Sequence, residues 1–509
     1  MKSLAQKLFH PHQIEGFALP LIRKLCEALD AGAVAYCHWK SNWRLDDWAR
    51  GDGDLDLLVA RSDAQQFVTI LSGLGFKQAR SSGEKQVPGV QNYYGFDREA
   101  ARFVHVHAHY QLVLGHDLTK NYHLPVEQPF LQSAVRLGSF KVPAPEFELI
   151  LFVLRMVLKF SLFDSLVPRS RAVSPGALQK ELDYLERQSD TTRVGALLRR
   201  HLPFIDSGFF ETCRRSVHPH SPVWRRLAVR QQLRSQLRSH ARSPRTVATL
   251  LTLTRRISKL GRRIGGMIGA SSSSSPRKRL ERGGALIALV GGDGAGKTTS
   301  LDALHAWLSQ KFDTRKAHLG KPPRSLITWA VLVPLRLCQL FNHLLEGRRP
   351  ARPLNEIRPV AFPGYLQLLR WVCAARDRYH LYAKARRFAT NGGLVLCDRY
   401  PIPQIKLMDG PNIYRFLDGA PKNRLVQFLV RAETRYYQQI MAPDLLLVLR
   451  LDPEIAVRRK VTESATHVRT RSRELWEVDW RDAHVRVIDA NQPLEHVLAG
   501  LQSLIWAEL

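Results

Sequence analysis

The segment 291–298 reads Gly-Gly-Asp-Gly-Ala-Gly-Lys-Thr and constrains the fold more than any other stretch of this chain. It matches the pattern G-x-x-x-x-G-K-[ST], follows an apolar run at 285–290, and precedes a predicted helix that begins near Lys297. A glycine-rich turn between strand and helix lets successive backbone N–H groups face one anion at the positive end of the helix. The segment therefore predicts a phosphate-binding loop in a parallel α/β sheet.

The side chains expected at this site come from the loop and from a second strand. Lys297 is predicted to bridge the β- and γ-phosphates of a nucleotide, and the Thr298 hydroxyl to bind Mg²⁺. An apolar run at 394–397 leads into Asp398 and Arg399. Because parallel strands end at one edge of a sheet, Asp398 is expected to complete the Mg²⁺ shell and Arg399 to contact a phosphate.

Further apolar runs at 445–449 and 485–488 alternate with helical stretches in the second half of the chain. This alternation is typical of a parallel sheet covered by helices on both faces. The sequence thus predicts an α/β fold class, with a phosphate-binding domain over 284–509.

Several motifs in this half resemble the thymidylate kinase family of P-loop kinases. Five segments match motifs of that family and follow one another in the same order. They are 293–299, the Ala-Arg-Asp-Arg-Tyr-His helix at 375–380, Asp-Arg-Tyr at 398–400, 443–453 and 488–494. The resemblance implies ATP and Mg²⁺ as cofactors and a phosphorylated small molecule as the acceptor. It implies that ATP is bound by Gly291, Asp293, Gly294, Gly296, Lys297, Thr298, Thr299, Asn491 and Gln492, and the acceptor phosphate by Arg378 and Arg399.

The acceptor and the lid differ from the family pattern. Segments 318–323 and 401–406 depart from the stretches that surround the base and sugar in the family, so a nucleoside monophosphate and a sugar phosphate both stay open. The loop carries no arginine of its own. Arg459 and Arg469 of a basic lid at 458–473 are therefore expected to stabilise charge on the transferred phosphoryl group.

The first half of the chain carries an Asp-x-Asp strand. Asp54 and Asp56 point the same way in an extended strand and suit a shared divalent metal. With the Lys-Ser turn at 40–41 and a later strand at 103–111, the region resembles the nucleotidyltransferase-like superfamily, and His107 stands where that family has a third carboxylate. The resemblance implies a metal site of Asp54, Asp56 and His107. The alternating histidines 105, 107 and 109 alternatively bind a transition metal, act as bases, line a ligand pocket or form a structural row.

Positive charge is concentrated between the two halves. The chain has 76 Lys+Arg and 45 Asp+Glu, a net charge of +31, and residues 213–282 hold a single acid, Glu281. Arginines recur every four residues from 226 to 242, which on a helix forms one basic stripe. This segment is expected either to dock on an anionic membrane or to be a solvated arm; nucleic acid is disfavoured because no aromatics interleave the charges.

The expected domains are 15–212, nucleotidyltransferase-like with a helical extension; 213–283, the basic arm and linker; and 284–509, the kinase. Scattered cysteines and the absence of a signal-peptide pattern predict a cytoplasmic protein, peripheral to the membrane if the arm docks. A true thymidylate kinase with an accessory domain and a nucleotide-gated regulatory or membrane-docking protein are the alternatives. A first half that binds without catalysis, and a homodimer, also stay open.

Overall fold

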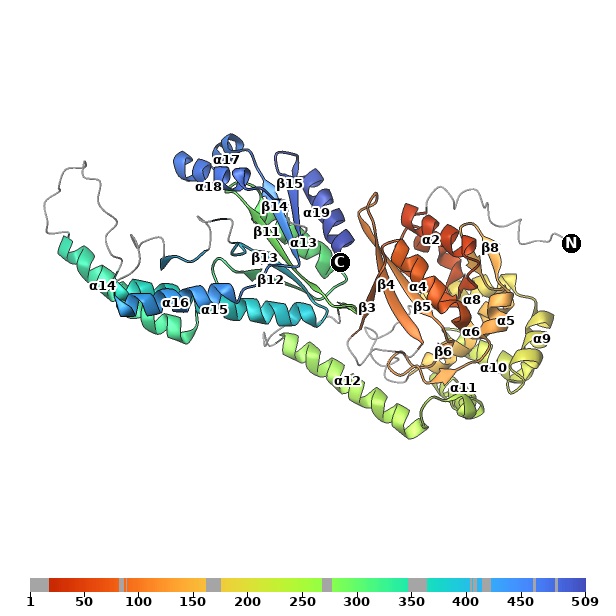
Figure 1. Ribbon diagram of the computed structural model, residues 1–509. Coiled ribbons are helices and arrows are strands. Elements are labelled where there is room, and N and C mark those ends of the chain that lie inside the picture. Colours follow the sequence, from red (N-terminus) through yellow and green to blue (C-terminus); the bar gives the residue numbers. More distant parts are fainter. Residues whose placement is uncertain are drawn as a thin grey trace. The chain divides into compact units, whose positions relative to one another are not determined.

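The computed structural model describes residues 18–81, 87, 89–161, 175–267, 277–346, 364–402, 405, 410–413, 423–460, 464–480 and 484–509. The chain divides into two compact units, Met1–Pro276 (unit 1) and Arg277–Leu509 (unit 2). Both contain helices and a strand sheet (Figure 1), which confirms the predicted α/β class.

Unit 1 is built on a mixed sheet in which β1, β2, β5, β4 and β3 lie in this order. Its strands are β1 (Tyr36–His38), β2 (Asp54–Val59), β3 (Lys77–Arg80), β4 (Val90–Asp97) and β5 (Arg102–His109), with short strands β6 (Val113–Leu114), β7 (Tyr122–His123), β8 (Val135–Leu137) and β9 (Phe140–Val142). β2 and β5 are parallel neighbours, and the other pairs in this sheet are antiparallel. Asp56 of β2 lies opposite His107 of β5.

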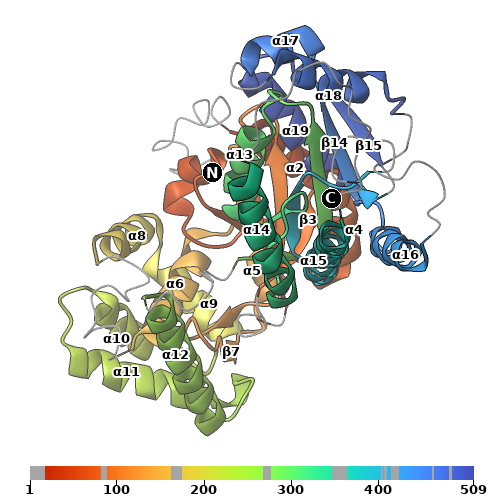
Figure 2. The ribbon, with the colours of Figure 1, turned by 90° about the vertical axis from the view of Figure 1, so that its left-hand side faces the viewer.

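The helices of unit 1 fall into two groups. Those around the sheet are α2 (Pro20–Ala31), α3 (Leu45–Ala49), α4 (Ala64–Gly73) and α5 (Glu127–Gln132); those of the helical part are α6 (Pro145–Lys159), α8 (Pro175–Gln188), α9 (Thr191–His201), α10 (Ser207–Val217), α11 (Val223–Gln236) and α12 (Arg245–Met267). The sequence of α6 is apolar almost all round, as expected of a buried helix. It packs against α8, α9, α10 and α11 (Figure 2), and so forms the centre of this part.

Much of the expected basic arm folds into unit 1. Val229 and Leu233 of α11 are buried in the same apolar core as α6, because they share one face of an amphipathic helix. Arg234 donates from Nε to the Tyr122 hydroxyl at 3.0 Å, and Arg242 donates from Nη1 to the Lys120 carbonyl at 3.1 Å. Part of the basic stripe therefore lies against its own unit instead of projecting freely into solvent.

Unit 2 contains a five-stranded parallel sheet in the order β12-β13-β11-β14-β15. The five strands of this sheet are β11 (Ala285–Gly291), β12 (Thr314–His318), β13 (Leu394–Asp398), β14 (Leu445–Arg450) and β15 (Val485–Asp489); the short strand β10 (Arg279–Leu280) is not part of it. Its helices are α13 (Lys297–Ser309), α14 (Leu326–Glu346), α15 (Tyr365–Thr390), α16 (Arg424–Gln438), α17 (Pro453–Arg459), α18 (Ala465–Glu477) and α19 (Leu494–Glu508).

Helices cover the sheet of unit 2 on both faces, as the alternating sequence predicts. α13 and α19 contact each other and the sheet on one side, and α15 contacts β11 and β13 on the other (Figure 1). The central strands β11, β13 and β14 are nearly continuous runs of buried apolar residues, because both of their faces are covered. None of the helices in the described ranges is long and apolar enough to span a bilayer.

Candidate functional site

The loop between β11 and α13 has the backbone shape that its glycines predict. Gly294 and Gly296 both have φ of 80°, a left-handed conformation in which a side chain is strained. Gly292 is required for a different reason: a Cβ there would lie 2.7 Å from Oγ of Ser472 on α18. The loop is thus closely approached by a helix from the far end of the chain.

Lys297 opens α13 and is buried at the loop. Its Nζ donates to the Gly292 carbonyl at 2.7 Å, which holds the ammonium across the turn. Burial lowers the pKa of Lys297, and the nearby Asp293 carboxylate opposes that shift. Thr298 and Thr299 follow in the first helical turn with exposed side chains. The positions of all these groups are compatible with the predicted phosphate contacts.

Asp398 ends β13 beside the loop strand. It lies opposite Leu289 of β11 and His318 of β12, and its carboxylate charge acts on the pKa of Lys297. Its Oδ1 is buried and has no hydrogen-bond partner within the described residues. His318 Nε2 lies 3.8 Å from the other carboxylate oxygen, Oδ2. A buried carboxylate oxygen without a hydrogen-bond partner in the described residues fits a hard cation such as Mg²⁺.

Arg399 follows Asp398 with φ of 55°, an unusual value for a residue other than glycine. Its positive charge acts on Lys297 and contributes to lowering the pKa of that lysine. The left-handed backbone costs about 1 kcal/mol. Such conformations cluster at functional sites, so this residue joins the set at the edge of the sheet.

Arg378 is buried in α15 and binds groups of its own unit. Its Nε donates to the Leu319 carbonyl at 2.6 Å, Nη2 donates to the Gly320 carbonyl at 3.2 Å, and Nη1 contacts the Tyr437 hydroxyl. Its predicted contact with an acceptor phosphate stays a prediction. The structure adds that Arg378 holds the start of the segment 318–323, which departs from the family pattern.

Arg459 and Arg469, the arginines expected in the lid, contact protein groups. Arg459 Nη1 donates to the Ala490 carbonyl at 3.2 Å, and Arg469 pairs with Glu454 at 2.6 Å on the surface. A third arginine, Arg471, reaches the loop instead: its Nη1 lies 3.1 Å from Oδ2 of Asp293. Sequence reasoning missed Arg471, although it stands on α18 only two residues from Arg469.

Asn491 and Gln492, predicted to bind ATP, follow β15 and are exposed. The Asn491 side chain accepts from the Asp452 backbone N–H at 3.2 Å and donates to Asp489 Oδ1 at 2.7 Å. These bonds order the turn before α19. Their contact with ATP stays a prediction.

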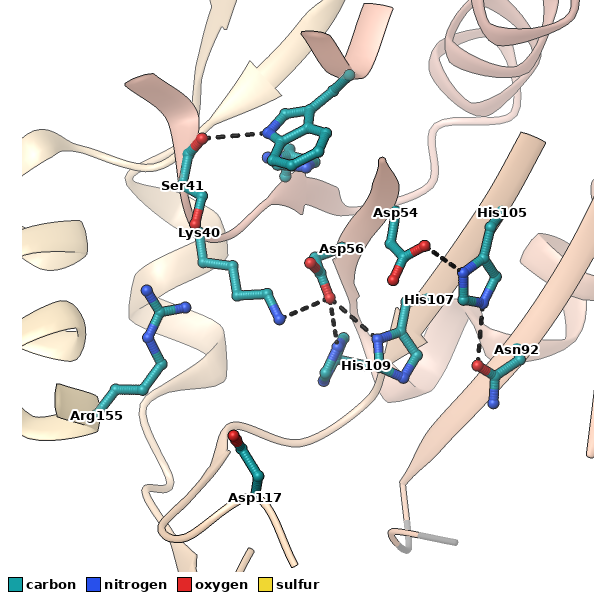
Figure 3. Close-up of polar contacts among 12 residues, drawn as sticks. Lys40, Ser41, Asp54, Asp56, Asn92, His105, His107, His109, Asp117 and Arg155 are labelled. Carbon is teal, nitrogen blue, oxygen red and sulfur yellow. Dashed lines mark hydrogen bonds and ion pairs between the residues drawn. The ribbon is translucent and has the colours of Figure 1, made fainter. Parts of the chain in front are cut away.

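Unit 1 holds a second cluster, centred on Asp56 (Figure 3). One oxygen, Oδ1, lies 2.8 Å from Lys40 Nζ, 3.1 Å from His107 Nδ1 and 3.2 Å from His109 Nε2. Burial acts to raise the pKa of Asp56, but the Lys40 ammonium and the two histidine hydrogen bonds hold it well below its usual range. Burial also lowers the pKa of His109 to about 3. The carboxylate is therefore ionised at neutral pH.

Asp54 does not join this cluster. It accepts from His105 Nδ1 at 2.6 Å, and the other ring nitrogen of His105 contacts Asn92 Oδ1 at 3.0 Å (Figure 3). His105 also stacks on Tyr94, with ring centroids 4.3 Å apart. Of the predicted set Asp54, Asp56 and His107, the structure brings the last two together and adds His109 in place of Asp54.

Cationic side chains gather on one side of the cluster. Arg155, which pairs with Glu181 at 3.0 Å, lies on the Lys40 side of Asp56 (Figure 3). The Lys120 side chain is partly buried, and this desolvation lowers its pKa to about 8, with the charges of Lys40 and Arg155 acting in the same direction. Sequence reasoning missed Lys120 and Arg155, because both come from segments well separated from the Asp-x-Asp strand.

Part of the chain is similar in sequence to known proteins. No protein-family model matches the chain. The Uncharacterized ATP-binding protein YghR of Escherichia coli (strain K12) is 26% identical over 242 residues, which cover 46% of this chain and 91% of the relative. A protein named thymidylate kinase in Thermosynechococcus vestitus is 26% identical over 242 residues, 44% of this chain and 88% of that enzyme. Another thymidylate kinase, from Chromohalobacter salexigens, is 27% identical over 231 residues, 43% of this chain and 93% of that enzyme.

These similarities and the geometry of the loop both indicate a nucleotide-binding region. The chain contains a P-loop kinase-like region, which confirms the coarser part of the expected resemblance. None of these names concerns nucleotidyl transfer, and the resemblance of unit 1 to that superfamily stays a prediction.

Proposed function

We propose that unit 2 is an ATP- and Mg²⁺-dependent kinase that transfers the γ-phosphoryl group to a phosphorylated small molecule, either a nucleoside monophosphate or a sugar phosphate. The observation that carries this proposal is the buried Lys297 ammonium at the loop together with Asp398, whose charge acts on the pKa of Lys297 and whose Oδ1 has no hydrogen-bond partner in the described part of the chain. ATP-binding proteins and thymidylate kinases among the relatives support the same reading.

In this mechanism the residues act mainly by positioning and by charge. The N–H groups of 292–297 and the Lys297 ammonium bind the phosphates of the donor. Thr298 and Asp398 are the residues that would hold Mg²⁺, which neutralises charge on the phosphates when bound. Arg399 and the lid arginines then stabilise the charge that develops on the transferred group.

The acceptor is bound in this proposal next to the segment that Arg378 holds. Leu319 and Gly320 accept hydrogen bonds from Arg378, and both lie in the stretch that differs from thymidylate kinases. The donor site matches the motifs of thymidylate kinases, whereas the proposed acceptor-binding segment does not. This difference supports an acceptor other than thymidine monophosphate.

The test measures ATP consumption by the full chain with Mg²⁺ across nucleoside monophosphates and sugar phosphates. Lys297→Ala should reduce turnover by about 100-fold or more, because a donor to the developing charge is lost. Lys384→Ala, on the exposed surface of α15, is the matched control and should leave turnover unchanged. Equal turnover in Lys297→Ala and the unaltered chain contradicts the proposal.

The panel also separates the alternatives. Turnover on thymidine monophosphate alone identifies a thymidylate kinase with an accessory unit. ATP binding without turnover on any acceptor favours a nucleotide-gated regulator, in which the loop senses the nucleotide.

We further propose that α12 docks unit 1 on an anionic membrane surface. Leu250 and Ile257 are 62% and 61% exposed, and Val247 and Leu251 lie on the same face at helical spacing. The segment 213–282 around them carries a large excess of Lys and Arg, which complements anionic headgroups.

Sedimentation with vesicles of phosphatidylserine and phosphatidylcholine tests this docking. The full chain should bind these vesicles and bind pure phosphatidylcholine weakly. The double variant Leu250→Glu/Ile257→Glu should lose binding, whereas Leu494→Glu, an exposed leucine of α19, should keep it. Unchanged binding of the double variant contradicts the proposal.

A further inference from the structure

We propose that unit 1 binds one divalent transition-metal ion through Asp56, His107 and His109. One oxygen of the carboxylate and one nitrogen of each imidazole lie within 4.8 Å of one another. Neither the kinase reaction of unit 2 nor the comparisons assign a ligand to this place. The inference is independent of the proposed kinase function.

The strands determine that these three side chains converge. β2 and β5 are adjacent and parallel, with Asp56 directly opposite His107. His109 lies two residues further along β5, so its side chain emerges on the same face of the sheet. β5 pairs with β2 on one side and with β4 on the other, so the backbone that carries His107 and His109 is hydrogen-bonded on both sides.

The spacing of the ligand atoms suits a metal without rearrangement of the strands. The Asp56 oxygen lies 3.1 Å from His107 Nδ1 and 3.2 Å from His109 Nε2. Two ligands at about 2.0 Å from a tetrahedral metal are about 3.3 Å apart, which is close to both distances. A metal can therefore replace the two hydrogen bonds to Asp56, and the two imidazole nitrogens, within 4.8 Å of each other, need only side-chain adjustment to join it.

The ligand chemistry selects the class of metal. Two imidazoles and one carboxylate are typical ligands of Zn²⁺, Fe²⁺ and related ions, whereas Mg²⁺ prefers oxygen ligands. Asp54, which would have supplied a second carboxylate, is held by His105 at 2.6 Å. The site thus differs from the set of Asp54, Asp56 and His107 that the sequence resemblance implies.

The Asp56 carboxylate already binds one cation, the Lys40 ammonium. Its ammonium lies 2.8 Å from the same Asp56 oxygen, with the Trp39 ring 5.0 Å from Nζ. A lysine is flexible and the side chain is partly exposed, so it can withdraw when a metal arrives. Its positive charge lowers the affinity for a divalent ion, which makes Lys40 a built-in competitor.

Titration of the metal-free full chain with Co²⁺ tests the site, with the visible absorption of the bound ion as the readout. The unaltered chain should bind one equivalent with an absorption typical of nitrogen and oxygen ligands. His107→Ala, whose side chain is 29% exposed, should weaken this binding by about 100-fold or more, and Lys40→Met should tighten it. Zn²⁺ should displace the Co²⁺, and Mg²⁺ in excess should not.

Asp54→Asn is the matched control, because Asp54 lies on the same strand as Asp56 and is 53% exposed. It should bind Co²⁺ like the unaltered chain. Circular dichroism of each variant verifies that the fold is kept, and His107→Gln serves as a second variant if His107→Ala unfolds. One-equivalent binding that survives the loss of His107, or no Co²⁺ binding by the folded full chain, overturns the proposal.

Discussion

Arg471 on α18 lies 3.1 Å from Asp293 in the phosphate-binding loop, although 178 residues separate them in the chain. The contact brings a guanidinium to the donor site from the predicted lid. Arg469, two residues earlier, turns away and pairs with Glu454. Arg471 is therefore a lid arginine whose guanidinium contacts a side chain of the loop.

Arg471→Ala should reduce kcat/KM of the proposed kinase by about 10- to 100-fold, because it removes a positive charge from the loop. Steady-state kinetics with saturating acceptor measures the loss. Arg473→Ala is the control: Arg473 pairs with Glu477 at 3.8 Å on the exposed face of α18. A larger loss in Arg469→Ala than in Arg471→Ala contradicts this assignment.

Gly292→Ala should destabilise unit 2 by about 1 to 3 kcal/mol, because the new Cβ would lie 2.7 Å from Ser472 Oγ. Ser472→Ala removes that oxygen, which is buried and has no hydrogen-bond partner in the described ranges. The double variant should therefore regain part of the loss, as a thermal unfolding scan of all three variants would show. Purely additive effects argue against a direct clash between these two positions.

Asp377→Ala should lower the free energy of unfolding by about 1 to 3 kcal/mol. The buried Asp377 carboxylate accepts from the Ser325 backbone N–H at 2.9 Å and from the Thr328 hydroxyl at 2.6 Å, and the variant loses both hydrogen bonds. Urea denaturation measures the change. Asp302→Ala, in an exposed pair with Lys316, should change stability by less than about 0.5 kcal/mol.

Glu148 should make unit 1 less stable as pH rises. Burial raises its pKa from 4.5 to about 7, although Asn42 donates two hydrogen bonds to the carboxylate. Between pH 4.5 and 7 the folded state holds more protons than the unfolded state, so stability is greatest below this window and is lost through it, by up to about 3 kcal/mol.

Urea denaturation of the unaltered chain and of Glu148→Gln at pH 5 and pH 8 measures this effect. The variant cannot titrate at this position, so the difference in unfolding free energy between the two proteins should change with pH. Parallel pH profiles would show that Glu148 does not contribute.

The sequence showed where the basic stripe lies in the chain, but not that part of it contacts other residues of unit 1. Helical spacing correctly places arginines 226, 230 and 234 on neighbouring turns of α11, but the helix ends at Gln236, so Arg238 and Arg242 lie beyond it. Spacing also says nothing about which surface of the protein these arginines contact. Arg234 is paired with Tyr122, which lies 112 residues away in the chain. The apolar stripe of α12 was missed because Leu250 and Ile257 read equally well as core residues.

Local sequence was enough to predict the phosphate-binding loop of this protein. A strand, a glycine-rich turn, Lys297 and a helix are consecutive, so the chemistry of that site is encoded within a few residues. The same holds for Asp398, because a buried strand that ends in an acid places it at the edge of the sheet.

Only the tertiary structure decided which residues complete the two clusters. Alternation along a strand put Asp54 and Asp56 on one face, but the register of β2 against β5 gave Asp56 to His107 and His109 and left Asp54 to His105. Likewise, the packing of α18 brought Arg471 and not Arg469 to the loop. Register and helix packing depend on contacts between distant segments, and these follow from the burial of the whole apolar core rather than from any local pattern.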